Sequence, residues 1–171
     1  MKSIGESRWA AYAAFVWMVS SVVWHIGMGV VADDDVADGG PWGYTAYIAY
    51  DSLIIIMSIV GAVLCLATVR PWGDRLSRRT VLAPIAIGSV LLIVRGVPGL
   101  IENIFVLTGI TPRGFLGVVD DSVETPSTTE VWQGVAINAY FFVGAILLVP
   151  ATINYFRRTR AAVRVEEDVT G

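Results

Sequence analysis

The sequence has one cysteine and one histidine, and this scarcity limits the chemistry available to the chain. The lone Cys65 excludes an internal disulfide and any C-x-x-C redox or zinc motif, so we interpret it as a small apolar helix residue. The chain also lacks the H-E-x-x-H and G-x-S-x-G patterns of zinc proteases and serine hydrolases. Because few candidates remain for a nucleophile, a base or a metal ligand, we expect no enzyme, no cofactor and no metal site.

Charged residues are scarce as well, at 16% of 171 residues, whereas 55% are hydrophobic and the mean hydropathy is +0.65. Soluble domains carry about 25% charged residues. We therefore expect a chain that is solvated mainly by lipid, with the bilayer as its first partner. The charged segments are short and the acidic ones contain no basic cluster, so nucleic acid is not an expected partner.

Four apolar stretches contain most of the hydrophobic residues: about 9–31, 46–69, 81–108 and 131–155. Each reaches the roughly 20 residues that a helix needs to cross about 30 Å of hydrocarbon. The pattern predicts an all-α, polytopic membrane protein, a four-helix bundle over residues 1–156, followed by a polar, frayed cytoplasmic tail at 157–171. Tryptophans at the span ends support these boundaries, because their rings favour the headgroup region: Trp9, Trp42, Trp72 and Trp132.

Basic and acidic residues occupy different connections. Ten of the twelve bases lie before the first span, between the second and third, and after the fourth, whereas eight of the fifteen acids lie in the other two connections. Basic connections face the cytoplasm, so we expect both termini inside. Arginine exceeds lysine eleven to one, which is typical of GC-rich bacteria and suggests a bacterial inner membrane.

Two local signals concern the ends of the helices. "VVA" ending at Ala32 resembles a signal-peptide cleavage site, which would remove the first span. We favour a retained helix, because a span of about 23 residues exceeds the 7 to 15 of a signal-peptide core. Ser127 and Glu130 fit an S-x-x-E capping box, which predicts where the last helix begins.

Strongly polar side chains are few within the spans: His25, Asp51, Arg95, Glu102, Asn103 and Asn138. In the expected orientation and with a rise of 1.5 Å per residue, Arg95 lies near the midplane. Four other residues lie outward of the centres of their spans: His25 by roughly 7 Å, Asp51 by roughly 10 Å, Asn138 by roughly 6 Å and Glu102 by roughly 12 Å. This common depth predicts a polar layer in the outer half of the bundle.

Each span also has one face of small or polar residues at helical spacing. Small residues permit close backbone approach in lipid and polar ones seek partners across helices, so we expect these faces to point inward. The four faces are Ala14, Met18, Ser21, His25 and Met28; Asp51, Ser58, Ala62 and Cys65; Gly88, Arg95, Gly99 and Glu102; and Gly134, Asn138, Phe141 and Ala145.

Two interpretations of the polar layer remain open. His25, Asp51, Arg95, Glu102 and Asn138 would line an outward-facing pocket for a small molecule, a lipid headgroup or a proton, because ionisable groups in membranes are functional by default. Alternatively, the chain is a structural or accessory subunit, alone or as a homo-oligomer, and these residues only fix helix packing. With neutral His25 the layer holds one cation and two carboxylates. One carboxylate then lacks a counter-ion. That carboxylate is protonated, pairs with His25 in its charged form or meets a cationic ligand.

Proline in the third span predicts a bend. Pro98 removes a helix hydrogen bond and pushes against the carbonyl of Val94, and Gly96 and Gly99 weaken the same turn. We therefore expect a kink between Arg95 and Glu102.

Four short stretches carry a resemblance to a known family: "WHIGMG", "VRPWGDRLSRR", "VRGVPGLIEN" and "NAYFFVGAILL". Over about residues 9–156 the chain resembles an uncharacterised family of small four-helix bacterial membrane proteins. The resemblance implies fold and location only, and it carries no catalytic or ligand residues over to this chain.

Overall fold

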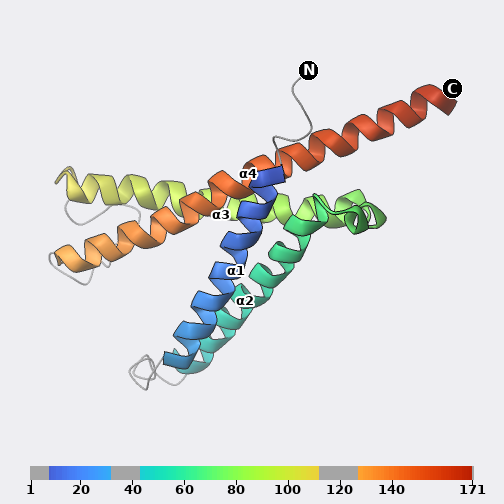
Figure 1. Cartoon of the computed structure of the whole chain (residues 1–171). Coiled ribbons are helices and arrows are strands. Elements are labelled where there is room, and N and C mark those ends of the chain that lie inside the picture. Colours follow the sequence, from blue (N-terminus) through green and yellow to red (C-terminus); the bar gives the residue numbers. More distant parts are fainter. Residues whose placement is uncertain (1–7, 32–42, 112–126, 171) are drawn as a thin grey trace. The chain divides into compact units, whose positions relative to one another are not determined.

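Four long helices make up almost all of the computed structural model. It describes residues 8–31, 43–111 and 127–170, with side chains described as far as Arg160 in the last stretch. These residues form α1 (Arg8–Val31), α2 (Gly43–Ala67), the 3-10 helix η2 (Pro71–Arg75), α3 (Arg78–Leu107) and α4 (Thr128–Thr170), and no strand (Figure 1). All four α-helices contain a segment long and apolar enough to cross a membrane. The predicted all-α class with four transmembrane helices is confirmed.

Helix α4 is longer than the span predicted from the sequence. Its apolar segment ends at Arg160, and the helix itself continues to Thr170. Residues 157–170, expected to form a tail after the fourth span, belong to this helix. This stretch contains no glycine or proline, the two residues that most strongly end a helix, so the helix continues after the apolar pattern stops.

Side-chain caps define where α3 and α4 begin. The backbone N–H of Ser127 donates to Glu130 Oε2 at 2.6 Å, and the backbone N–H of Glu130 donates to Ser127 Oγ at 3.3 Å. This is the predicted capping box, and it satisfies two backbone donors at the start of α4. At the start of α3, Ser77 Oγ accepts the backbone N–H of Thr80 at 3.1 Å.

The chain divides into two compact units. Unit 1 comprises Met1–Ile85 and Pro150–Gly171, and unit 2 comprises Ala86–Val149. Unit 1 thus holds α1, α2, η2, the first turns of α3 and the last part of α4. Unit 2 holds the rest of α3 and α4.

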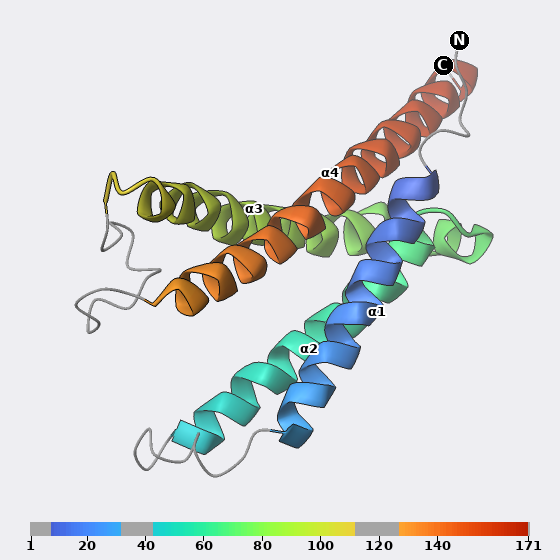
Figure 2. The same ribbon diagram turned by 60° about the vertical axis from the view of Figure 1, so that its left-hand side comes forward.

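In unit 1, α1 and α2 lie side by side (Figures 1 and 2). Ser58 Oγ donates to Ser21 Oγ at 3.2 Å, and a Cβ at Gly61 would lie 3.0 Å from the sulfur of Met18. Residues later in α1 contact residues earlier in α2, so the two helices are antiparallel. The predicted inward face of α2 is buried throughout, at Asp51, Ser58, Ala62 and Cys65. On α1, Ala14, Met18 and Ser21 are buried, but the prediction is wrong for Met28, which is 41% exposed near the helix end.

In unit 2, α3 and α4 are also antiparallel, and glycines bring their backbones together. A Cβ at Gly88 would lie 3.5 Å from Leu148 Cδ2, and one at Gly134 would lie 3.0 Å from Asn103 Nδ2. A Cβ at Gly96 would lie only 2.7 Å from the backbone nitrogen of Phe142. Small residues thus permit the close packing expected of membrane helices.

We expect the capping box to contribute measurably to stability. Ser127→Ala should lower the free energy of unfolding by about 1 kcal/mol, because the N–H of Glu130 loses its acceptor. Thermal unfolding of the purified protein in detergent measures this change. Thr129→Ala removes a neighbouring exposed hydroxyl and should alter stability by less than about 0.5 kcal/mol. Equal losses in the two variants would contradict the capping role.

Candidate functional site

The structure places the predicted pocket residues in two sets, one in each unit. His25 and Asp51 belong to unit 1, whereas Arg95, Glu102 and Asn138 belong to unit 2. Each set is held by contacts within its own helix pair. A single polar layer shared by all four helices therefore stays a prediction.

The first set is a pair of ionisable groups between α1 and α2. Nδ1 of His25 lies 2.5 Å from Oδ1 of Asp51, and the side chains are 22% and 8% exposed. Gly29, one turn after His25, lies beside the other carboxylate oxygen, since a Cβ there would be 3.6 Å from Oδ2. The carboxylate thus lies against the last turns of α1, on the face that also carries Ser21 and Met18.

Few other titratable groups belong to this part of α1. Between Tyr12 and the helix end at Val31, His25 is the only titratable side chain of α1, and Asp51 is the group that α2 presents to it. With neutral His25 and ionised Asp51, the pair carries one negative charge. One added proton makes the pair neutral overall, whether it stays on the imidazole or moves to the carboxyl group. Proton uptake therefore changes the charge of this interface while its hydrogen bond can persist.

The second set is a directional hydrogen-bond chain between α3 and α4. Arg95 Nη1 donates to Asn138 Oδ1 at 2.5 Å, and Asn138 Nδ2 donates to Asn103 Oδ1 at 2.6 Å. Asn138 is 0% exposed and Asn103 is 2% exposed. Both bonds run in the same direction from the cation, so each bond polarises the next. Asn103 and Asn138 are thus hydrogen-bond partners across the α3–α4 interface.

Arg95 lies at the edge of this interface. Its side chain is exposed, and its guanidinium lies 5.3 Å from the ring centroid of Phe141 on α4. A long side chain can extend along a helix surface and still place its charged end on a polar partner. The amide of Asn138 and the ring of Phe141 thus bind the guanidinium. Glu102, which lies on α3 like Arg95, is fully buried.

Gly96 also contributes to this site, although it was not among the residues predicted to face inward. The backbone of Phe142 leaves no room for a side chain at Gly96, and the amide of Asn138 leaves none at Gly99. The spacing of three residues between these glycines was the available signal. Helix α3 includes Pro98, and the kink expected between Arg95 and Glu102 stays a prediction.

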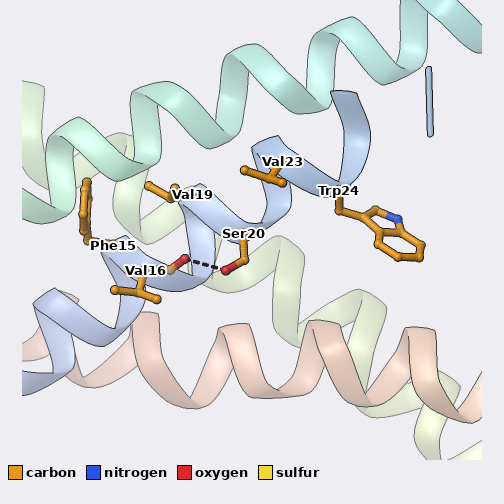
Figure 3. Close-up of a pocket in the computed structure, with 6 residues that line it drawn as sticks. All are labelled: Phe15, Val16, Val19, Ser20, Val23 and Trp24. Atoms are coloured by element: carbon orange, nitrogen blue, oxygen red, sulfur yellow. Dashed lines mark hydrogen bonds between the residues drawn. The ribbon is translucent and has the colours of Figure 1, made fainter. Parts of the chain in front are cut away.

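Neither of two hollows on the described surface, one along α1 and one at the start of α4, is lined by a residue of the polar sets. The hollow along α1 has a volume of about 350 Å³. Six residues of this helix line it (Figure 3): Phe15, Val16, Val19, Ser20, Val23 and Trp24. The hydroxyl of Ser20 donates to the Val16 carbonyl of the same helix at 3.0 Å. An apolar hollow along one helix is what a lipid-facing surface offers. Over the described residues, no group of three or more His, Cys, Asp or Glu side chains could hold a metal ion.

We expect the close approach at Gly96 to be intolerant of a side chain. Gly96→Ala should lower the free energy of unfolding by about 1–3 kcal/mol, because the added methyl group overlaps the Phe142 backbone. A Cβ at Gly27 on α1 would have nothing within 4 Å, so Gly27→Ala should be neutral or stabilise the helix by up to about 1 kcal/mol. Thermal unfolding in detergent compares the two. If both were tolerated equally, α3 and α4 would not approach as described.

No family model matches the chain, and no curated protein or solved structure is similar to it. The resemblance to a family of small four-helix membrane proteins therefore stays a prediction. The His25–Asp51 pair and the Arg95–Asn138–Asn103 chain are the features from which a function can be inferred.

Proposed function

We propose that this multi-pass membrane protein takes up and releases a proton at the His25–Asp51 pair. The observation that supports the proposal is the 2.5 Å contact between two ionisable side chains inside a packed pair of transmembrane helices. Such groups are rare within membranes and are functional by default. Histidine is also the side chain whose charge most readily changes between about pH 5 and 8.

Charge favours this pair over the other polar set. A guanidinium group is not deprotonated in proteins, and side-chain amides do not titrate. The Arg95–Asn138–Asn103 chain therefore has no protonation change to offer. His25 with Asp51 has two accessible net charges, and a change between them alters the electrostatic free energy of the α1–α2 interface.

Size favours a proton over a larger ligand. A bound small molecule needs a concave site of a few hundred Å³ lined by convergent polar groups. The α1 hollow contains neither His25 nor Asp51, and its lining is mostly apolar. A proton needs no cavity, only a donor and an acceptor within hydrogen-bond distance. We place the pair in the outer half of a bacterial inner membrane, with both termini in the cytoplasm, on the strength of the arginine distribution.

A structural role is the second candidate, and the hydrogen-bond chain of unit 2 favours it. Its two amides are buried and satisfied by each other and by Arg95. Such a chain fixes the register of α3 against α4, because a shift along either helix would leave a buried amide without its partner. The two roles are compatible, since they involve different helix pairs.

The single histidine makes the proton proposal directly testable. In protein labelled with ¹⁵N-histidine, every imidazole signal belongs to His25. We expect this signal to change with pH in lipid nanodiscs, and to follow a different pH dependence in Asp51→Asn, because the neutral amide interacts differently with the charged imidazole.

Ser58→Ala is the matched control for this experiment. It removes a polar contact from the same face of α2 without changing charge, so its ¹⁵N signal should follow that of the wild type. A signal that does not respond to pH, or an identical response in wild type and Asp51→Asn, would refute the proposal.

The structural role predicts energetic coupling between the two asparagines. In a double-mutant cycle, Asn138→Ala and Asn103→Ala should be coupled by about 0.6 kcal/mol, and by at most about 1.7 kcal/mol, the range found for polar contacts between membrane helices. Asn138→Ala combined with Thr129→Ala, a site nine residues away along α4, should be additive within about 0.5 kcal/mol. Additivity in both cycles would remove the support for a structural hydrogen-bond chain.

A further inference from the structure

Five elements of unit 1 meet at one end, and this end is rich in arginine. Ala10 and Ala11 of α1 form an apolar cluster with Ala151 of α4, and Val69 packs against it. The Arg70 guanidinium lies 5.7 Å from the ring centroid of Tyr12, which joins the end of α2 to the start of α1.

Two further contacts bring η2 and α3 to the same place. The Arg78 guanidinium, at the start of α3, lies 4.8 Å from the ring centroid of Phe156 on α4. Arg158 Nη2 on α4 lies 3.7 Å from Asp74 Oδ1 in η2. We call this region the arginine end. Its basic residues are Arg8, Arg70, Arg75, Arg78, Arg79, Arg157, Arg158 and Arg160.

The charge of the arginine end is strongly unbalanced. Asp74 is the only carboxylate among the described residues 8–24, 67–85 and 150–160, which form this end, and these residues carry eight guanidinium groups. The Arg158–Asp74 contact is exposed, with side chains 44% and 72% accessible, and it neutralises at most one of them. Seven of the eight arginines are exposed, and Arg78 is half-buried. The remaining positive charge is therefore available to an external anion.

Aromatic rings hold four of these guanidinium groups in place. Two of them are Arg70, against Tyr12, and Arg78, against Phe156. Arg158 lies 5.5 Å from the ring centroid of Tyr155, and Arg160 lies 6.0 Å from the ring centroid of Phe156. A guanidinium over a ring uses its face for the contact, which leaves its N–H edges free to bind oxygen. Those edges form a planar fork that matches the geometry of a phosphate group. The contacts thus preorganise donors for an oxyanion.

The position of the arginine end indicates the source of the phosphate. It lies where the apolar segments of α1 and α3 begin and that of α2 ends, which is the depth of lipid headgroups. The rings of Trp9 and Trp72 are exposed there, at 59% and 41%, as is usual for residues in the headgroup region. A phosphate presented at this depth belongs to the lipid.

We propose that the arginine end binds the phosphate headgroups of anionic phospholipids. Their net negative charge matches the excess of guanidinium groups, whereas a zwitterionic headgroup brings its own ammonium group and gains less. This function uses residues separate from His25 and Asp51 and does not depend on the proton proposal.

Native mass spectrometry of the full chain in detergent tests the proposal. We expect wild type to bind phosphatidylglycerol at least about five-fold more tightly than phosphatidylcholine with the same acyl chains. Arg78→Gln and Arg158→Gln should each lower the affinity for phosphatidylglycerol about five-fold and leave that for phosphatidylcholine unchanged. Equal affinity of the wild type for the two lipids would overturn the proposal.

Three controls separate a headgroup site from other causes. Arg113→Gln removes one positive charge from the expected outer loop, outside the described residues, and should bind phosphatidylglycerol as the wild type does. Arg78→Lys keeps the charge and should bind more tightly than Arg78→Gln, which distinguishes lost charge from lost folding. Inorganic phosphate should not displace the lipid; if it does, or if the exposed Arg158→Gln binds as the wild type does, the proposal fails.

Discussion

The lack of water in the hydrocarbon core is the constraint on which the rest of this structure depends. A polar group in that region has to find its partner within the protein, because an unsatisfied one costs several kcal/mol. Helices satisfy the backbone, and the two polar sets satisfy the side chains in different ways. Unit 1 pairs two ionisable groups, His25 with Asp51, whereas unit 2 links one fixed cation to two neutral amides. Only the first arrangement can change its charge.

Close helix packing makes both arrangements possible. In unit 2, glycines at 96 and 99 bring α3 so near to α4 that the amide of Asn138 can reach both Arg95 and Asn103. In unit 1, Gly61 receives the side chain of Met18, and the serine pair lies between this contact and the His25–Asp51 pair. Small residues thus act in the same way in both units, by bringing short polar side chains within hydrogen-bond distance. The chemistry of each interface then depends on which polar residues were brought together.

The arginine end of unit 1 follows the opposite principle, because its charges lie where water and headgroups are present. Guanidinium groups there need no carboxylate partner, and aromatic rings orient them instead. Unit 1 therefore combines a nearly buried pair of ionisable groups with an exposed, positively charged end. The first suits an exchangeable proton, and the second suits a permanent anionic surface.

Local signals in the sequence were enough to determine the class, the four spans, most inward faces and the capping box of α4, because composition, helical period and residue spacing depend on near neighbours. They also identified Asn103 and Asn138 as strongly polar residues within the spans. The tertiary structure decided which groups meet: Arg95 binds Asn138, and Asp51 binds His25. That choice depends on which helices pack together and in what register, and period and composition do not contain this information. The arginine–aromatic contacts were not foreseen for the same reason, since Tyr12 and Arg70, or Arg78 and Phe156, are distant in the chain and adjacent only after folding.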